Sequence, residues 1–279
     1  MKEVTDASYH ANTSAGIVEV NGTRLYYEAC GAGPPLLFLH GFTLDRRMWR
    51  RQVESLSDRY RVVTYDARGF GRSAMPGTDP YRHCDDAAAL CEALGLRRVV
   101  AIGHSIGAHQ LLELALERPD LIGAWVGVCT SGLASIPFSP DLLTMFATVR
   151  KAAGEKGIEE AKRAWGEAGW FAPARERPEL AKELDDMLAD YSGWHWTHDN
   201  PAKNLAPPAA ERLHELRAPA LVIAAERDLP YNHQVARTLV AQIGGAIDLW
   251  LPAAGHMANM EQPAPIDRAI ADFADRGAR

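Results

Sequence analysis

Residues 99–107 read Val-Val-Ala-Ile-Gly-His-Ser-Ile-Gly, and this stretch decides the fold. Val99–Ile102 is a short, fully apolar run, which is typical of a strand buried on both faces of a parallel sheet. Gly103–Gly107 matches the pattern G-x-S-x-G, and an Ala- and Leu-rich helix is expected from there to about Glu117. A chain that reverses so sharply strains the backbone at Ser105, and the flanking glycines remove side-chain clashes. The turn therefore points the Ser105 hydroxyl out of the sheet.

Short apolar strands alternate with helices on both sides of this turn. Ile17–Val20 and Thr23–Cys30 flank Asn21-Gly22, a pair of residues that favours a tight hairpin. The alternation predicts an α/β fold, with a mostly parallel sheet flanked by helices on both faces. The other expected strands are Leu36–Leu39, Arg61–Tyr65, Trp125–Cys129, Leu221–Ala225 and Ile247–Leu251, and the other expected helices are Met48–Leu56, Cys84–Leu94, His233–Ile243 and Pro265–Phe273.

The alternation stops between Ser131 and about Leu216, where the sequence predicts helices and loops. We expect residues 1–130 and 217–279 to form one core, with residues 131–216 as a helical lid inserted after the strand that follows the Ser105 helix. Such a lid would cover the carboxyl edge of the sheet, where open α/β sheets bind their ligands. Its aromatic rings can face a substrate pocket or fill the lid's own core, and we expect some of each. The candidate pocket residues are Trp165, Trp170, Phe171, Trp194 and Trp196, together with Met257.

A serine hydroxyl is a weak nucleophile at neutral pH, so a base must lie beside it and an acid must orient that base. On this architecture the chain order is serine, then acid, then histidine. Asp228 follows the expected strand Leu221–Ala225, and His256 follows the last expected strand. Both polar groups come just after the carboxyl end of a strand, at the same edge of the sheet as Ser105. Glu226 is nearer to its strand and remains an alternative acid or a supporting partner.

Attack on a carbonyl also requires donors that hold the developing negative charge on its oxygen. The backbone N–H of Ile106 lies at the start of the expected helix, where negative charge is stabilised. A second donor is expected from the loop after Leu36–Leu39, which reads His40-Gly41-Phe42-Thr43. We therefore predict the N–H groups of Phe42 and Ile106 as the oxyanion hole.

Composition and charge exclude several classes of function. The chain has 279 residues, of which 47% are hydrophobic and 24% charged, and its formal net charge is -6. It lacks the basic surface expected of a protein that binds nucleic acid or an anionic membrane. The basic stretch Arg46–Arg51 is interleaved with Met and Trp, as on the solvated face of an amphipathic helix. No apolar run reaches the roughly 18 residues of a membrane span, and Met1–Ala15 is polar, so we expect a cytoplasmic protein.

The cysteines and histidines do not form a metal-binding pattern. No two cysteines form a C-x-x-C pair, and the pair of histidines in His195–His198 has no further ligands to complete a tetrahedral zinc site. We therefore expect reduced thiols, no metal and no organic cofactor. The cysteines are Cys30, Cys84, Cys91 and Cys129.

Together these motifs resemble the α/β-hydrolase fold superfamily, in particular its small serine esterases, enol-lactonases and haloperoxidase-like members. The matching motifs follow one another in the family's order between about residues 36 and 260. They are His40–Phe42, Asp66–Ser73, Gly103–Gly107, Asp228 and Gly255-His256. The resemblance implies that Asp66–Ser73 is a structural turn near the site. Relatives that act as haloalkane dehalogenases or epoxide hydrolases carry an aspartate at the position of Ser105, and ring-cleavage C–C hydrolases usually carry Asn at that of His104.

The resulting hypothesis is a serine hydrolase that cleaves a carboxylic ester or lactone of a small, largely apolar molecule through an acyl-enzyme. Ser105 would be the nucleophile, His256 the base and Asp228 the acid. Alternatives on the same triad are a lyase, a C–C hydrolase, a cofactor-free perhydrolase or oxygenase, and a ligand receptor with slow turnover. The expected partner is a small-molecule ester or lactone, with no nucleic acid and no membrane, and the sequence predicts no oligomeric state.

Overall fold

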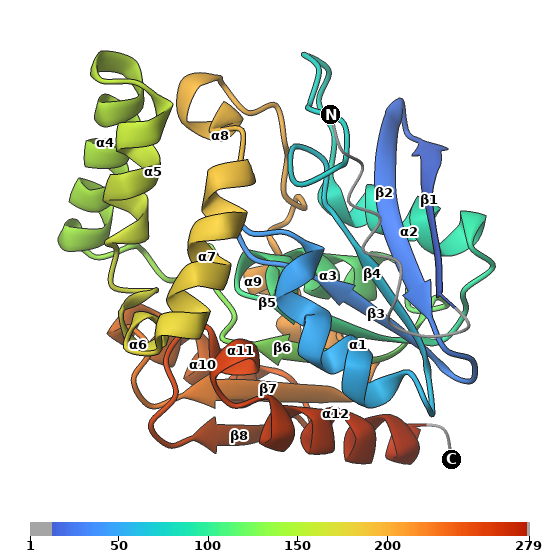
Figure 1. Cartoon of the computed structure of the whole chain (residues 1–279). Coiled ribbons are helices and arrows are strands. Elements are labelled where there is room, and N and C mark those ends of the chain that lie inside the picture. Colours follow the sequence, from blue (N-terminus) through green and yellow to red (C-terminus); the bar gives the residue numbers. More distant parts are fainter. Residues whose placement is uncertain (1–12, 278–279) are drawn as a thin grey trace.

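One sheet of eight strands runs through the molecule in the order β1-β2-β4-β3-β5-β6-β7-β8 (Figure 1). The computed structural model describes residues 13–277. The strands are β1 (Thr13–Val20), β2 (Thr23–Cys30), β3 (Pro35–Leu39), β4 (Arg61–Tyr65), β5 (Val99–His104), β6 (Ile122–Val128), β7 (Ala220–Ala225) and β8 (Ile247–Leu251).

Six of these strands, β3 to β8, are parallel, whereas β1 and β2 are antiparallel to their neighbours. The hairpin between β1 and β2 turns at Asn21 (φ 48°) and Gly22 (φ 69°), as the Asn-Gly pair predicts. Every residue of β5 and β7 is buried, which agrees with their continuous apolar sequences. The predicted α/β fold with a mostly parallel sheet is therefore confirmed.

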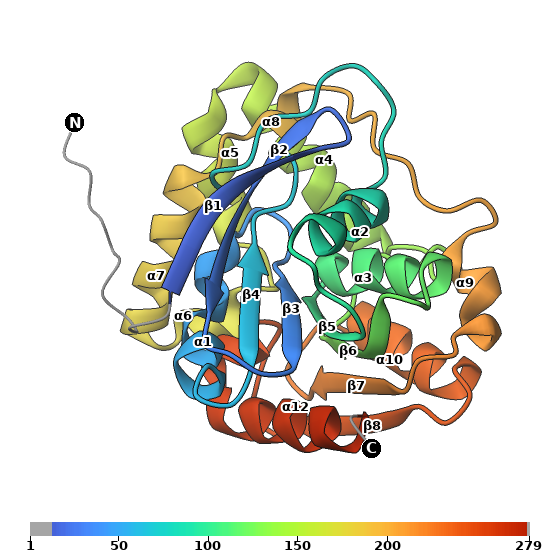
Figure 2. The ribbon, with the colours of Figure 1, turned by 90° about the vertical axis from the view of Figure 1, so that its right-hand side faces the viewer.

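Helices cover both faces of the sheet. Helices α1 and α12 lie on one face, while α2 and α3 lie on the other (Figures 1 and 2). The core helices are α1 (Arg50–Leu56), α2 (His83–Ala93), α3 (Ile106–Glu117), α10 (Pro230–Gln242), α11 (Ala258–Glu261) and α12 (Pro263–Gly277), with a 3-10 helix η1 (Arg46–Trp49) before α1. Because the strands point their carboxyl ends to one edge, each loop after a strand delivers its side chains to the same side of the molecule.

Several element boundaries differ from the predictions, and for β6 and α12 the reason is local. Strand β6 begins at Ile122 rather than at the predicted Trp125. Gly123 lowers the strand propensity of this stretch, which is why the prediction began later, but residues from Ile122 onward still pair with β5. Helix α12 begins at Pro263, since proline fits the first turn of a helix, and it runs past the predicted end at Phe273.

The basic stretch Arg46–Arg51 is not simply a solvated face, and for Arg46 that prediction is wrong. The Arg46 side chain is only 11% exposed and is paired with Glu28 and Asp66. Arg51 instead reaches across to Glu183, at a distance of 2.8 Å. The positive charges of this stretch are therefore neutralised by carboxylates inside the protein.

Residues 131–216, which we call the inserted segment, contribute no strand to the sheet. In Figure 1 the helices α4, α5 and α7 lie on the side to which the arrowheads of β6, β7 and β8 point. The helices of the inserted segment are α4 (Pro140–Glu155), α5 (Ile158–Gly166), α6 (Ala172–Arg175), α7 (Pro178–Asp190), α8 (Trp194–Thr197) and α9 (Ala209–Arg212), followed by the 3-10 helix η2 (Leu213–Glu215).

The structure bears on the predictions about the N-terminus, membrane spans and cysteines only within the described residues. Met1–Ala15 lies outside the described residues except for the start of β1 at Thr13. Between residues 13 and 277, no helix is long and apolar enough to cross a membrane. The four cysteines are free and buried, in agreement with the expectation of reduced thiols.

Candidate active site

The turn at Ser105 has the strained backbone that its sequence predicts. Ser105 has φ 56° and ψ −124°, outside the regions that L-residues ordinarily occupy, and it precedes the first residue of α3. A Cβ at Gly103 would lie 2.3 Å from the Ala108 backbone, and one at Gly107 would lie 2.3 Å from the His40 carbonyl oxygen. Only glycine fits at both positions, so strand, turn and helix pack this closely only with the G-x-S-x-G sequence.

The structure brings Ser105, His256 and Asp228 together at the carboxyl edge of the sheet. His256 Nε2 lies 3.0 Å from Ser105 Oγ, and His256 Nδ1 lies 2.8 Å from Asp228 Oδ2. All three side chains are buried, with Ser105 and Asp228 each 8% exposed and His256 3% exposed. The His256 ring lies between Ser105 and Asp228, which is the arrangement expected of a base between a nucleophile and an acid.

The charge of Asp228 determines which nitrogen of the His256 ring carries the proton. Burial favours the neutral acid, but the nearby His256 and hydrogen bonds from His256, Asn232 and the Leu229 N–H outweigh it and lower the pKa of Asp228. An ionised carboxylate only accepts hydrogen bonds, so the proton on the His256 ring lies on Nδ1. Nε2 is then free to accept the Ser105 hydroxyl proton. The alternative acid, Glu226, is exposed to solvent.

Asn232 is a buried member of the site that the sequence analysis missed. Its Nδ2 lies 2.8 Å from Asp228 Oδ1 and 2.7 Å from His256 Nδ1. Because Nδ1 donates its own proton to Asp228, the amide donates to the carboxylate, while Ser131 Oγ donates to Asn232 Oδ1. The available signal was its position four residues after Asp228, one helical turn into α10.

The two predicted oxyanion donors both have free amides. Within the described residues, the N–H groups of Phe42 and Ile106 make no hydrogen bond to another protein group. Ile106 is the first residue of α3, so its N–H has no partner inside the helix. Phe42 lies in a turn closed by the hydrogen bond from the Leu44 N–H to the Gly41 carbonyl.

Two further buried groups surround His256. The His104 ring lies against it, with Nε2 2.8 Å from the His256 carbonyl oxygen, and burial together with the nearby His256 lowers the pKa of His104 to about 3. Cys129 offers a sulfur within 4.8 Å of ligand atoms of Asp228 and His256. Burial and the neighbouring Asp228 charge raise the pKa of the Cys129 thiol, so it stays protonated and is a poor metal ligand.

Rings of the inserted segment form a layer over this site, packed from ring to ring. Trp170 lies 6.0 Å from the His256 ring and 5.5 Å from Trp165, measured between ring centroids. Trp165 in turn lies 5.5 Å from Phe42, the residue that carries the predicted oxyanion donor. We call this group the aromatic cluster, and its other members are Phe146, Phe171, Tyr191, Trp196, His195 and Phe70.

The remaining predicted pocket residues lie in different surroundings. Trp194 stacks on His198 at 5.0 Å, and its other ring contact is with His195 at the border of the aromatic cluster. Met257 is buried directly after His256, at the start of α11. Of the predicted rings, the structure therefore gathers Trp165, Trp170, Phe171 and Trp196 but leaves Trp194 at the periphery.

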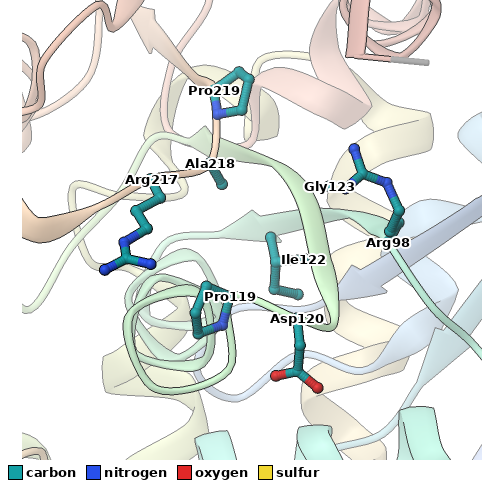
Figure 3. A pocket seen from close by; sticks show the side chains of 8 residues that line it. All are labelled: Arg98, Pro119, Asp120, Ile122, Gly123, Arg217, Ala218 and Pro219. Atoms are coloured by element: carbon teal, nitrogen blue, oxygen red, sulfur yellow. The ribbon is translucent and has the colours of Figure 1, made fainter. Parts of the chain in front are cut away.

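A cavity of about 370 Å³ lies at the opposite edge of the sheet (Figure 3). Its lining comes from the amino ends of β5, β6 and β7, including Arg98, Ile122 and Pro219. In Figure 3 the guanidinium groups of Arg98 and Arg217 lie on opposite sides of the view and point in different directions, so they do not converge on one ligand. The lining of this cavity includes none of Ser105, Asp228 and His256.

Comparison with known proteins agrees with this architecture. The chain superposes on a thermophilic esterase from Thermogutta terrifontis with a TM-score of 0.77 and 25% identity, covering 95% of this chain and 99% of that one. It superposes on Est816, an N-acyl homoserine lactone degrading enzyme, with a TM-score of 0.75 and 28% identity, covering 92% and 100%. An epoxide hydrolase from Caballeronia sordidicola is 36% identical over 126 residues, which is 43% of this chain and 36% of that relative.

The family assignment rests on most of the chain. The model of the alpha/beta hydrolase family matches residues 36–269, a range that includes the Ser105 turn, both loops that carry Asp228 and His256, and the whole inserted segment. The chain belongs to the alpha/beta hydrolase family.

Proposed function

We propose that this hydrolase cleaves a carboxylic ester or lactone of a small, largely apolar molecule, with Ser105 as nucleophile. The observation that carries the proposal is the position of His256, whose two ring nitrogens lie 3.0 Å from Ser105 Oγ and 2.8 Å from Asp228 Oδ2. This is the geometry of a serine activated by a base that is itself oriented by an acid. Similarity to an esterase and to a lactone-degrading enzyme supports the substrate class.

The proposed reaction has two halves that pass through an acyl-enzyme. Ser105 Oγ gives its proton to His256 Nε2 and bonds to the carbonyl carbon, whose oxygen becomes an oxyanion held by the N–H groups of Phe42 and Ile106. Collapse breaks the bond to the leaving oxygen, which takes the proton from His256. Water then attacks the acyl-enzyme with His256 as base, and the acid departs as the proton returns to Ser105. Asp228 stabilises the imidazolium in both halves.

The inserted segment would act as the lid of this site, on a core made of residues 1–130 and 217–279. The aromatic cluster lies over His256 and presents mostly apolar rings, of which Trp170 is the one in ring contact with His256. An apolar cover removes water from the reacting groups and favours apolar acyl or alcohol portions of the substrate. No metal and no organic cofactor has a part in this mechanism.

The similarity to an epoxide hydrolase does not lead us to propose epoxide opening. Family resemblance places an aspartate at the nucleophile position in those enzymes, because its carboxylate forms the covalent ester with the opened ring. Ser105 holds that position here, and its hydroxyl instead suits attack on an acyl carbon.

A panel of p-nitrophenyl esters of rising acyl length and simple lactones tests the proposal, with Ser105→Ala as the matched control. We expect hydrolysis by the wild type, a loss of at least about 10³-fold in the variant, and stoichiometric labelling of Ser105 by a serine-directed phosphonate. Activity that survives Ser105→Ala, or a label on another residue with activity intact, would overturn the assignment of the nucleophile.

A further inference from the structure

One hydrogen bond joins the inserted segment directly to the loop that carries the oxyanion donor. Trp165, in the last turn of α5, donates from Nε1 to Thr43 Oγ1 at 2.7 Å. Thr43 Oγ1 in turn donates to the carbonyl oxygen of Phe42 at 2.6 Å. Thr43 is 1% exposed and Trp165 4% exposed, so water does not replace this contact while the segment is in place.

Thr43 needs such support because its backbone is unfavourable. Its φ is 64°, in the left-handed region, which is rare for any residue with a Cβ and rarer still for a β-branched one. The turn from Gly41 to Leu44 normally takes glycine or asparagine at this position. Threonine therefore holds the turn at a cost in free energy, and contacts around its side chain must offset that cost.

These contacts bear on catalysis because Phe42 lies in the same turn. The orientation of the Phe42 N–H depends on the turn conformation, and a donor in an oxyanion hole works only when it is aimed beforehand. The Trp165 ring also packs edge-on against the Phe42 ring, with centroids 5.5 Å apart and planes at 88°. Trp165 of α5 thus contacts the side chains of both Phe42 and Thr43.

We propose that the hydrogen bond from Trp165 to Thr43 positions the oxyanion donor Phe42, so that the site is competent only while α5 is closed over it. This inference rests on the proposed function, since it takes Phe42 as the oxyanion donor. Thr43 and Trp165 are positioning residues here, because they act through Phe42. Movement of α5 away from the sheet breaks the bond and leaves the strained turn at Thr43 free to relax.

Conservative substitutions separate this role from simple packing. Trp165→Phe keeps an aromatic ring in the cluster but removes the N–H, and Thr43→Val keeps the shape of threonine but removes the hydroxyl. Thr43→Ser retains the hydroxyl and should therefore keep the activity that Thr43→Val loses. The matched control is Trp49→Phe, since Trp49 is a fully buried indole whose N–H has no hydrogen-bond partner within residues 13–277. Melting temperatures of all variants show that they fold.

The substrate for this test is p-nitrophenyl acetate, which is too small to depend on contacts with the lid. We expect Trp165→Phe and Thr43→Val each to lower kcat about 10- to 100-fold, a smaller effect than removing a whole oxyanion donor, with little change in KM. Affinity for phenylboronic acid, which forms a tetrahedral adduct with the serine, should fall by the same factor. The double variant should lose no more than Thr43→Val alone, because that change already removes the hydrogen bond from Trp165 along with the one to the Phe42 carbonyl.

Three results would overturn the proposal. They are a Trp165→Phe variant with the kcat of Trp49→Phe, an effect confined to long-chain esters, and additive losses in the double variant. Each of these leaves the wild-type ester hydrolysis and the labelling of Ser105 intact. Failure of the proposed function gives a different outcome, because the wild type would then bind no boronic acid and hydrolyse no ester through Ser105.

Discussion

The His256 ring lies between two neighbours, and the position of its single proton determines how it can bond to each of them. Asp228 accepts the Nδ1 proton at 2.8 Å, which leaves Nε2 as the acceptor for Ser105 at 3.0 Å. The second carboxylate oxygen of Asp228 accepts from Asn232 and from the Leu229 N–H, so the carboxylate cannot rotate without losing hydrogen bonds. The tautomer of His256 is thus determined by groups that never touch a substrate.

Substitution of the acid tests this arrangement most directly. Asp228→Asn presents an amide that can donate to Nδ1 and thereby favours the tautomer with its proton on Nε2, which cannot accept from Ser105. We expect kcat to fall by about 10⁴-fold, the size of the effect in serine proteases. Glu226→Gln is the control, since Glu226 is exposed beyond the same strand, and it should change kcat far less. The measurement is steady-state hydrolysis of p-nitrophenyl acetate, and the reverse ranking would make Glu226 the acid.

At this scale the sequence predicts the three side chains that the structure brings together but not the residues that support them. Ser105, Asp228 and His256 follow from a turn motif and from the order of strands, because each lies just beyond a strand end. Asn232 and Thr43 have their roles through contacts between elements far apart in sequence. Such contacts leave no local pattern, apart from the helical spacing of Asn232 from Asp228.

At the scale of elements, continuous apolar runs predict the buried strands well, whereas a glycine within a strand obscures where the strand begins. The strands predicted at Val99–Ile102 and Leu221–Ala225 follow from the apolar character of these runs, since both faces of each strand are covered. The start of β6 was placed too late because Gly123 interrupts its apolar run. Composition alone does not predict where each short helix of the inserted segment begins and ends, because tertiary contacts stabilise these helices.

Helix α8 carries a half-buried histidine that gives the inserted segment a pH-dependent stability. His195 stacks on Phe70 with ring centroids 4.5 Å apart, and Tyr191 Oη lies 2.9 Å from its Nδ1. Burial lowers the pKa of His195 to about 4. Between pH 6.5 and 4 the unfolded chain therefore binds a proton that the folded chain excludes, so the free energy of unfolding falls as the pH falls through this window.

The expected size of this effect is about 2 kcal/mol between pH 7.5 and pH 5. His195→Phe keeps a ring against Phe70 but removes the titrating group, so this part of the pH dependence should disappear in the variant. Other buried histidines remain in both proteins and cancel in the difference. Urea unfolding of both proteins at the two pH values measures the difference, and equal pH dependence would show that folding does not lower the pKa of His195.

The whole molecule consists of a sheet core and an inserted segment held against it by two kinds of contact. Ion pairs join the rims: Arg47 pairs with Asp190, Arg51 with Glu183, and Arg227 with Glu176. Exposed pairs of this kind contribute only about 0–1 kcal/mol each. The aromatic cluster is a buried contact between the two parts, so we expect it to dominate both the position of the segment and the choice of substrate.

That expectation leads to a prediction about substrate length. Trp196 is 7% exposed and packs on Tyr191 and Trp165, whereas Trp194 stacks on His198 at the border of the cluster. Trp196→Ala removes apolar surface that a long acyl chain would touch, and binding energy from such remote contacts changes kcat/KM only for substrates that reach them. We expect a loss of about 1–3 kcal/mol in transition-state binding for medium-chain p-nitrophenyl esters and little loss for the acetate.

Trp194→Ala is the comparison in the same helix, and its effect on long esters should be smaller. The measurement is kcat/KM across the acyl series for both variants, together with their melting temperatures. A uniform loss over all chain lengths, accompanied by a lower melting temperature, would mean that the Trp196 ring only holds the segment together. The contrast with Trp165→Phe is then informative. Loss of the hydrogen bond to the loop that carries Phe42 should lower kcat even for the acetate, whereas loss of a ring that only lines the pocket should change selectivity among longer esters.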